Sequence, residues 1–158
     1  MALLEQDGIE YEIIPGISSA LAAAAELKIE YTIPGSTQTI IFTRMEGKTN
    51  VPKEEDLAKL ASHKSSLVIF LSSHLVKKVQ EKLLEHYNNE TPIAIAYRVG
   101  WPDSKIIKTT LKNLPDEMEK NDIKRHALIL IGPSISVQKN TEIRSYLYGS
   151  HKNRSTND

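Results

Sequence analysis

Short apolar runs alternate with amphipathic segments along the chain, and this alternation predicts strands joined by helices. The expected strands are runs of five to seven residues that contain consecutive apolar residues and are bounded by turn-forming residues. Such runs lie at residues 10–14, 38–43, 65–71, 93–97, 105–110 and 127–131. Because most of these runs lack a polar face, we expect a largely buried sheet.

Helices are expected between these runs, at residues 20–27, 52–61, 74–87 and within 111–120. Ser18 or Ser19 is expected to cap the first helix, and Ser72 or Ser73 the third, since serine oxygens accept from free amide groups at a helix start. The third helix is predicted to direct five apolar side chains inward, namely Leu75, Val76, Val79, Leu83 and Leu84.

Strands that alternate with helices predict an α/β fold. We expect a layered αβα domain with a mostly buried mixed sheet of about five strands. The domain is expected over residues 1–135. Hydrophobicity then falls, and residues 136–158 are expected to form a polar, partly disordered tail.

Composition excludes several classes of site. The 158 residues include 20 basic and 20 acidic side chains, so the net charge gives no reason to expect nucleic acid as a partner. Cysteine is absent, which removes disulfides and thiolate zinc sites. The five histidines lack helical metal-site spacing, so we expect no metal. No apolar run approaches the roughly 18–20 residues of a membrane span, and the start lacks a signal-peptide pattern. We expect a cytoplasmic protein that does not bind membranes.

Two segments carry candidate chemistry, each with an ordinary alternative. Residues 97–103, Tyr-Arg-Val-Gly-Trp-Pro-Asp, follow an expected strand and contain the single tryptophan. Such loops carry function in open α/β sheets, although the tryptophan could equally fill the core. Residues 15–19, Pro-Gly-Ile-Ser-Ser, form a strand-to-helix turn whose free amide groups could hold a polar ligand. An ordinary helix cap explains this second segment as well.

Five ordered segments together resemble the tetrapyrrole methylases, S-adenosylmethionine-dependent enzymes of corrin and sirohaem biosynthesis. The similarity runs from residue 8 to about residue 133. Within the family, residues 30–35, 38–44 and 97–103 are most similar to the members that methylate carbon 11 of a corrin precursor. The five segments are residues 11–19, 67–72, 97–103, 110–114 and 125–133.

The resemblance also implies what to expect of the whole enzyme. Family members begin with an N-terminal domain that carries a Gly-rich loop and a Gly-Asp motif, and neither motif occurs here. We therefore expect this chain to correspond to the C-terminal domain. In the family the methyl donor lies between the two domains, so the chain alone is expected to be inactive or nearly so.

Site residues are carried over from the family only at matching positions. The resemblance implies contacts with S-adenosylmethionine from six residues: Ser18, Ser19, Leu71, Val99, Gly100 and Ala127. Three arginines are candidates for the carboxylates of a tetrapyrrole substrate, because a guanidinium binds a carboxylate through two hydrogen bonds. They are Arg44, Arg98 and Arg125. An ion pair at the surface or within the domain is the alternative for each. No catalytic residue is assigned, since the donor carries its own leaving group.

Two further hypotheses remain beside this one. The chain could belong to a sibling enzyme, such as a uroporphyrinogen methyltransferase or a methylase of another corrin carbon. It could instead act as a dimerisation module, because the resemblance implies a homodimer.

Overall fold

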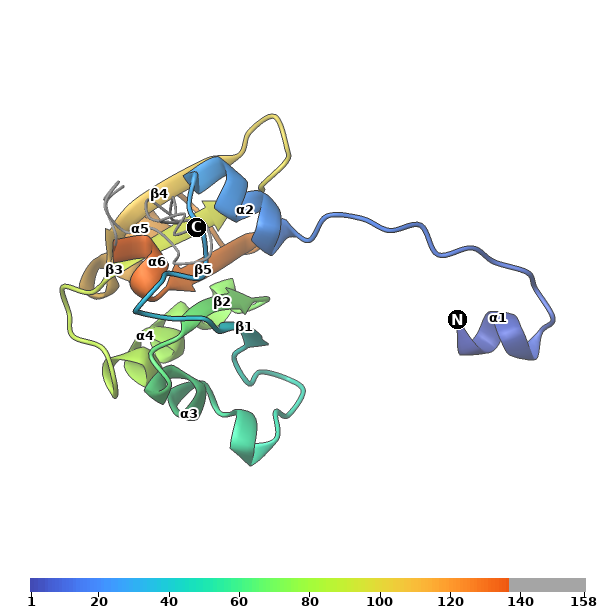
Figure 1. Cartoon of the computed structure of the whole chain (residues 1–158), viewed down its shortest axis with the longest axis horizontal. Helices are drawn as coiled ribbons and strands as arrows, with labels where there is room; N and C mark the ends of the chain where they lie inside the picture. The colour runs from blue at the N-terminus through green and yellow to red at the C-terminus, as the bar shows by residue number, and fades with distance from the viewer. Residues whose placement is uncertain (137–158) are drawn as a thin grey trace, which may run out of the picture.

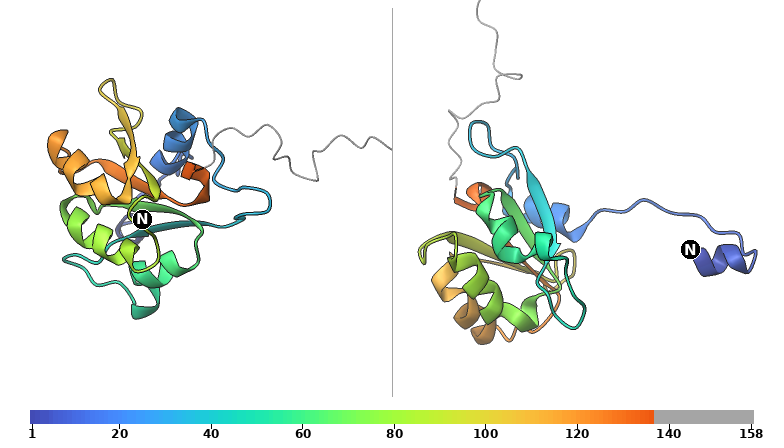
Figure 2. Two further views of the ribbon diagram at one scale, coloured as in Figure 1. Left: turned by 90° about the vertical axis from the view of Figure 1, so that its left-hand side faces the viewer. Right: turned by 90° about the horizontal axis from the view of Figure 1, so that it is seen from below.

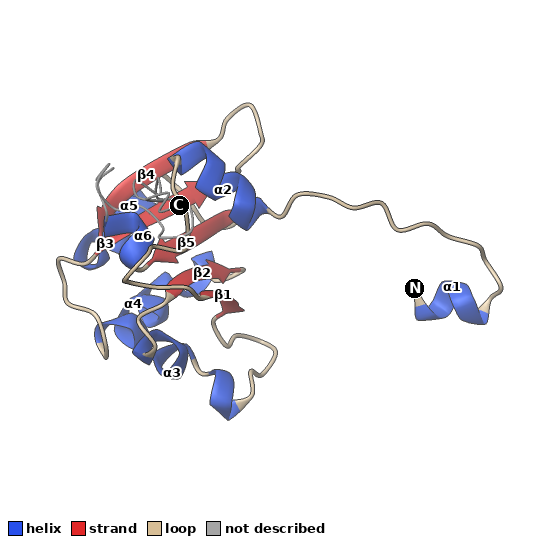
Figure 3. Ribbon diagram, in the orientation of Figure 1, coloured by secondary structure: helices blue, strands red, loops and turns tan. Residues whose placement is uncertain are grey.

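The structure is a computed structural model that describes residues 1–136. Five strands form one sheet in the order β1-β2-β5-β3-β4 (Figures 1 and 3). β1 and β2 are parallel, whereas the other neighbouring strands are antiparallel. The predicted mixed sheet is therefore confirmed. The strands are β1 (Ile40–Arg44), β2 (Ser66–Phe70), β3 (Pro92–Tyr97), β4 (Lys105–Thr110) and β5 (Ala127–Ile131).

The helices are short and lie mostly where the apolar periodicity placed them. Three single 3-10 turns occur at Lys53–Glu55, Ser73–Leu75 and Leu111–Asn113. The α-helices are α1 (Ala2–Gln6), α2 (Ser19–Leu27), α3 (Leu57–Ser62), α4 (Val76–Leu84), α5 (Leu114–Lys120) and α6 (Pro133–Ser136).

Helices cover both faces of the sheet, as Figure 2 shows. Alternate residues of a strand point to opposite faces, and β2 shows the consequence. Leu67 and Ile69 belong to the core beneath α3, α4 and α5, whereas Val68 packs with α2 on the other face. The alanines of α2 allow it to lie close to that face. The predicted αβα layering is thus confirmed.

The order of the strands brings three strand ends together. β5 lies between β2 and β3 and runs antiparallel to both. The start of β5 therefore lies beside the ends of β2 and β3. Tyr97, the last residue of β3, pairs with Ala127, the first of β5. This edge of the sheet carries the candidate site.

The strand predicted at residues 10–14 is wrong. Residues 9–18 have no regular secondary structure, and the chain extends away from the domain to α1 (Figure 1). Ile13 and Ile14 are 67% and 81% exposed. The local pattern suits a strand, but a strand also needs a neighbour for its backbone hydrogen bonds. Residues 1–136 supply none to this segment.

Several helix details also differ from expectation. The segment 52–61 is divided because Asp56 accepts a hydrogen bond from the Ala58 amide at 3.0 Å and starts α3. Ser72 does not cap the next helix. Its hydroxyl donates to the Phe70 carbonyl at 2.6 Å and accepts from the Met45 amide at 2.8 Å. Leu84, expected inside, is 37% exposed.

Two further expectations concern membrane spans and the polar tail. Within residues 1–136, no helix combines the length and apolar character that crossing a membrane requires. The predicted polar tail lies almost entirely outside the described residues, which end at Ser136.

Candidate functional site

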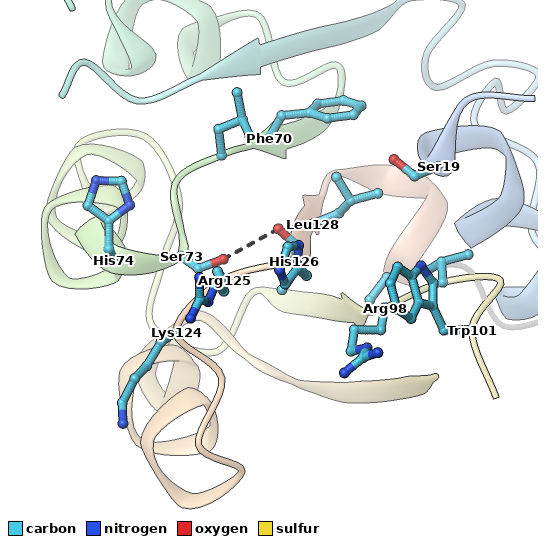
Figure 4. A pocket seen from close by; sticks show the side chains of 14 residues that line it. Ser19, Phe70, Ser73, His74, Arg98, Trp101, Lys124, Arg125, His126 and Leu128 are labelled. Carbon is cyan, nitrogen blue, oxygen red and sulfur yellow. Dashed lines mark hydrogen bonds between the residues drawn. The ribbon is translucent and has the colours of Figure 1, made fainter. Parts of the chain in front are cut away.

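A cavity of about 580 Å³ opens where β2 and β3 end and β5 begins (Figure 4). This volume falls within the range of roughly 300–1,000 Å³ that is usual for small-molecule sites. Segments far apart in the sequence contribute to it, from the start of α2 to the start of β5. The residues that line it are Ser19, Phe70, Leu71, Ser73, His74, Ala96, Arg98, Val99, Trp101, Lys124, Arg125, His126, Ala127 and Leu128.

Three residues around the cavity have left-handed backbone conformations. Leu71 follows β2 with φ 53°, Arg98 follows β3 with φ 48°, and His126 precedes β5 with φ 59°. The Arg98 amide donates to the His126 carbonyl at 2.9 Å, which ties two of these turns together. Non-glycine residues rarely adopt positive φ, and such strain gathers at functional sites. Here it turns three strands sharply at one edge.

Four of the six residues expected to contact S-adenosylmethionine line this cavity. They are Ser19, Leu71, Val99 and Ala127. Ser18 is adjacent, as the N-cap of α2, and its side chain accepts from the Ala20 amide at 3.3 Å. Gly100 follows Val99 and does not itself line the cavity. The fold thus gathers these positions, and their contact with a cofactor stays a prediction.

The three candidate arginines divide into two groups. Arg98 and Arg125 line the cavity, whereas Arg44 does not. The Arg44 guanidinium instead donates to the carbonyl oxygens of Thr49, at 3.2 Å, and Asn50, at 2.9 Å. These bonds hold the loop that follows β1, and they give Arg44 a local structural role.

Arg98 is already engaged by its own loop. Its Nη1 atom lies 3.1 Å from Oδ2 of Asp103, and its guanidinium lies 4.2 Å from the centre of the Trp101 ring. Figure 4 shows the guanidinium beside the indole. A substrate carboxylate that binds Arg98 would therefore compete with Asp103.

Both apolar and basic side chains line the cavity. Phe70, Leu71, Val99, Trp101 and Leu128 supply the apolar surface. The basic side chains that line it are His74, Arg98, Lys124, Arg125 and His126. Within the described part of the chain, no aspartate or glutamate lines this cavity. The arrangement suits a ligand that has a flat apolar part and a negatively charged neighbour.

Lys124 and Arg125 differ in their ion pairs. The Lys124 ammonium lies 2.7 Å from Oδ1 of Asp122. This hydrogen bond raises the pKa of Lys124 and lowers the pKa of Asp122. Arg125 makes no ion pair within residues 1–136. Arg125 is therefore the better placed of the two to take a carboxylate from a ligand.

Sequence reasoning missed several of the lining residues. Phe70, Ser73, His74, Lys124 and Leu128 were not among the candidates, and Trp101 was noted without a role at the site. Most of them adjoin a predicted residue, so extending each strand end by one or two positions would have found them. His74 carries no such signal, because a 3-10 turn brings it to the cavity.

Comparison with known proteins relates this geometry to a family. Residues 1–115 match the Tetrapyrrole (Corrin/Porphyrin) Methylases. The chain is 43% identical over 150 residues to the cobalt-precorrin-4 C(11)-methyltransferase of Priestia megaterium, covering 94% of this chain and 58% of that protein. It is 46% identical over 130 residues to the enzyme of the same name from Methanocaldococcus jannaschii, covering 82% of this chain and 50% of that protein.

Solved structures agree with the sequence matches. The structure of a cobalt-precorrin-4 methyltransferase has a TM-score of 0.81 and 45% identity, covering 85% of this chain and 56% of that one. A uroporphyrin-III C-methyltransferase from Thermus thermophilus is less similar, with a TM-score of 0.65 and 27% identity. That match covers 85% of this chain and 57% of the other. The chain thus spans about half the length of the proteins it matches. The resemblance and the fold expected from it are confirmed, and the chain belongs to the tetrapyrrole (corrin/porphyrin) methylase family.

Proposed function

We propose that this chain forms one side of the methyl-donor site of a cobalt-precorrin-4 C(11)-methyltransferase of cobalamin biosynthesis. The observation that carries the proposal is the cavity at the ends of β2 and β3, which gathers four positions assigned to the methyl donor. The identity of 43–46% to proteins of that name supports the choice of reaction.

The cavity suits the adenosyl part of the donor. Tetrapyrrole methylases use S-adenosylmethionine, which supplies a methyl group from its sulfonium centre. Leu71 and Val99 would cover the faces of the adenine ring, since their apolar surface lies on the cavity wall. Ala127 begins β5 at the edge of the cavity, and its backbone would meet the polar edge of the ring. Ser19 would meet the other end of the ligand from the start of α2.

The basic residues that line the cavity suit the other reactant. A corrin precursor carries many carboxylates, and Arg125 and Arg98 would bind them through paired hydrogen bonds. This binding would orient the substrate carbon toward the donor. Alignment of two reactants can lower a barrier by several kcal/mol without a catalytic side chain. We therefore assign binding and orientation to these residues, and no nucleophile or metal.

Half of the proposed site belongs to a longer protein. The aligned part of this chain covers only 58% and 50% of the two relatives, and we infer that the rest of each relative supplies the opposite wall. This chain then corresponds to a C-terminal domain, and alone it would be inactive or nearly so. A cytoplasmic setting is part of the same proposal.

Isothermal titration with S-adenosylhomocysteine tests the proposal. We expect clearly tighter binding by a protein that carries this chain together with the relatives' N-terminal half than by this chain alone. Equally tight binding by both would refute the two-sided site. No binding by either would refute the assignment of the cavity to the donor.

A pair of variants makes the same titration specific to the cavity. Leu71→Asn removes an apolar side chain from the cavity wall. Asparagine tolerates the left-handed backbone conformation of this position, so the substitution should not disturb the turn. We expect binding about tenfold weaker, in line with the loss of one apolar side-chain contact. Leu84→Asn is the control, because Leu84 lies on α4 and does not line the cavity; it is 37% exposed, against 78% for Leu71. Equal effects of the two substitutions would count against the site.

Sequence identity also helps to choose between this reaction and those of the sibling enzymes. The uroporphyrin-III methyltransferase structure is 27% identical, against 45% for the cobalt-precorrin-4 enzyme. This difference favours methylation of carbon 11. Product analysis with defined precursors would decide, since methylation of another carbon by the longer protein would select a sibling.

Self-association is a second proposal, supported by an uncovered apolar surface. β1 is an edge strand, and Ile40 and Phe42 are 38% and 49% exposed on it. Large exposed apolar surfaces often mark interfaces between proteins. We infer a homodimer, and light scattering over a range of concentrations tests it. A monomer at every concentration would refute this proposal and leave the methyl-donor site untouched.

A further inference from the structure

Glu26, in the last turn of α2, joins that helix to the loop between β3 and β4. Its Oε1 atom accepts from the Gly100 amide at 3.2 Å, and its Oε2 atom accepts from the Ser104 hydroxyl at 2.8 Å. Glu26 is exposed and does not line the cavity. Its two carboxylate oxygens nevertheless hold the middle and the far end of a loop that does.

This loop, residues 98–104, is shaped by its own short turns. The Trp101 amide donates to the Arg98 carbonyl at 3.0 Å, and the Ser104 amide donates to the Trp101 carbonyl at 3.0 Å. Gly100 has φ 82°, which suits glycine far better than other residues. These local bonds fix the curvature of the loop. They do not fix where it stands relative to the rest of the domain.

Few hydrogen bonds anchor the loop from outside. Within residues 1–136, the Arg98 amide bonds to the His126 carbonyl at the start of the loop, and the remaining external hydrogen bonds are the two to Glu26. Val99 and Trp101 lie between these anchors, and both line the cavity. Without Glu26 the loop would be held from outside at its first residue, by the packing of Val99 against the core on the α2 side, and by its continuation into β4. Trp101 and the far end of the loop would then have no outside anchor among the described hydrogen bonds.

We propose that Glu26 is a positioning residue, which holds Val99 and Trp101 as a ready-made wall of the cavity. The inference rests on the proposed function, because it assigns that wall to the adenosyl group. Because the loop is already in its binding conformation, ligand binding does not have to include the entropic cost of ordering it. Glu26 thereby strengthens binding without touching the ligand.

Trp101 offers a direct readout that needs no ligand. It is the single tryptophan of the chain, so time-resolved fluorescence anisotropy reports motion at this loop. We expect Glu26→Ala to increase the amplitude of the fast local motion on the nanosecond scale. Glu26→Gln should have a smaller effect, since its amide can accept from Gly100 and donate to Ser104. Ser104→Ala, which removes one of the two bonds, should also lie between the parent chain and Glu26→Ala.

Glu30→Ala is the matched control. Glu30 is an exposed carboxylate close in sequence to Glu26, and within the described residues it makes no side-chain hydrogen bond or ion pair. We expect its fluorescence to equal that of the parent chain. Both alanine variants should melt at about the same temperature, because exposed substitutions usually change stability little. If Glu26→Ala does not fold, the anisotropy of Glu26→Gln and Ser104→Ala is compared with that of the parent chain instead.

Titration with S-adenosylhomocysteine supplies the second arm. We expect Glu26→Ala to weaken binding about fivefold, as the loss of modest hydrogen bonds at an exposed site would predict. Unchanged anisotropy in Glu26→Ala would overturn the inference. The inference would also be overturned if Glu26→Ala increased the local motion of Trp101 but left the affinity for S-adenosylhomocysteine unchanged. If the parent chain and the longer protein both fail to bind the ligand, the proposed function fails, whereas the anisotropy still decides whether Glu26 holds the loop.

Discussion

Individual backbone conformations shape the edge of the sheet that carries the site. Leu71, Arg98 and His126 all adopt positive φ, at a cost of order 1 kcal/mol or more for each. Their sequence neighbours contain no signal for it, since glycine or asparagine would be the expected residues. Hydrogen bonds and packing in the assembled sheet hold these conformations. Local sequence therefore did not predict them.

Gly132, directly after β5, is required by its surroundings. Its φ is 133°, and a Cβ atom there would lie 2.6 Å from the Ser65 carbonyl oxygen. We expect Gly132→Ala to lower the free energy of unfolding by about 3 kcal/mol, through strain and overpacking. Urea denaturation measures this change. Gly16→Ala is the control, because no atom lies within 4 Å of its Cβ position; an equal loss there would contradict the explanation.

Tyr31 links stability to alkaline pH. Its hydroxyl donates to the Ala20 carbonyl at 2.6 Å, and burial raises the pKa of Tyr31 from 10.0 to about 12. The unfolded chain therefore loses this proton before the folded chain does. The contribution to stability is complete below about pH 10 and is lost as pH rises toward about 12.

The comparison with Tyr31→Phe isolates this effect. The phenylalanine variant lacks the ionisable group, so the parent chain should lose about 1 kcal/mol relative to it between about pH 9 and pH 11. Chemical denaturation at several pH values measures the difference. A constant difference across that range would show that Tyr31 ionises equally in both states.

At the scale of the element, α4 shows how one helix divides between core and solvent. Leu83 is fully buried among residues of α3 and α5, whereas Leu84 is 37% exposed. We expect Leu83→Ala to cost about 3 kcal/mol of stability and Leu84→Ala less than about 1 kcal/mol. Thermal or urea unfolding of both variants tests this division. Similar losses would mean that the helix is rotated from its described position.

Elements that the local pattern predicts well are those whose partners lie in the same domain. The run 127–131 is apolar throughout, and it became the central strand β5, buried along its whole length. Residues 10–14 were also expected to form a strand, but they include two glutamates and have no pairing partner within residues 1–136. Caps were less predictable, because Ser72 was free to bond to Met45 across the fold and did so.

At the scale of the molecule, charge is neutral overall but gathers locally. The basic residues that line the cavity lead us to expect that Arg125→Gln raises the KM for the proposed corrin substrate about tenfold in the longer protein, through loss of a charge-assisted hydrogen bond. Affinity for S-adenosylhomocysteine should change less than the KM, because the apolar wall that we assign to the adenosyl group is kept. Lys124→Gln is the control and should have the smaller effect, because Lys124 already pairs with Asp122. Equal effects on KM would contradict the assignment.

Much of the candidate site was accessible from the sequence by way of the family's motifs. Ser19, Leu71, Val99 and Ala127 were all expected, and they line one cavity. Arg44 was a candidate for substrate carboxylates, but it does not line this cavity, and its guanidinium donates to carbonyl groups of its own loop. An arginine at a strand end has the same local sequence signal in either role. Only the position of that strand at the edge of the sheet separates the two.

The sequence by itself determined the periodicity of the chain, and with it the class of fold and the layers of the core, because burial of apolar side chains depends on local spacing. Its ordered motifs also determined the family. The tertiary structure alone decided which strand ends meet, which carboxylate holds residues 98–104, and which arginines face the cavity. Those properties depend on contacts between segments as distant as Glu26 and Ser104, and the spacing of residues within one segment carries no information about them.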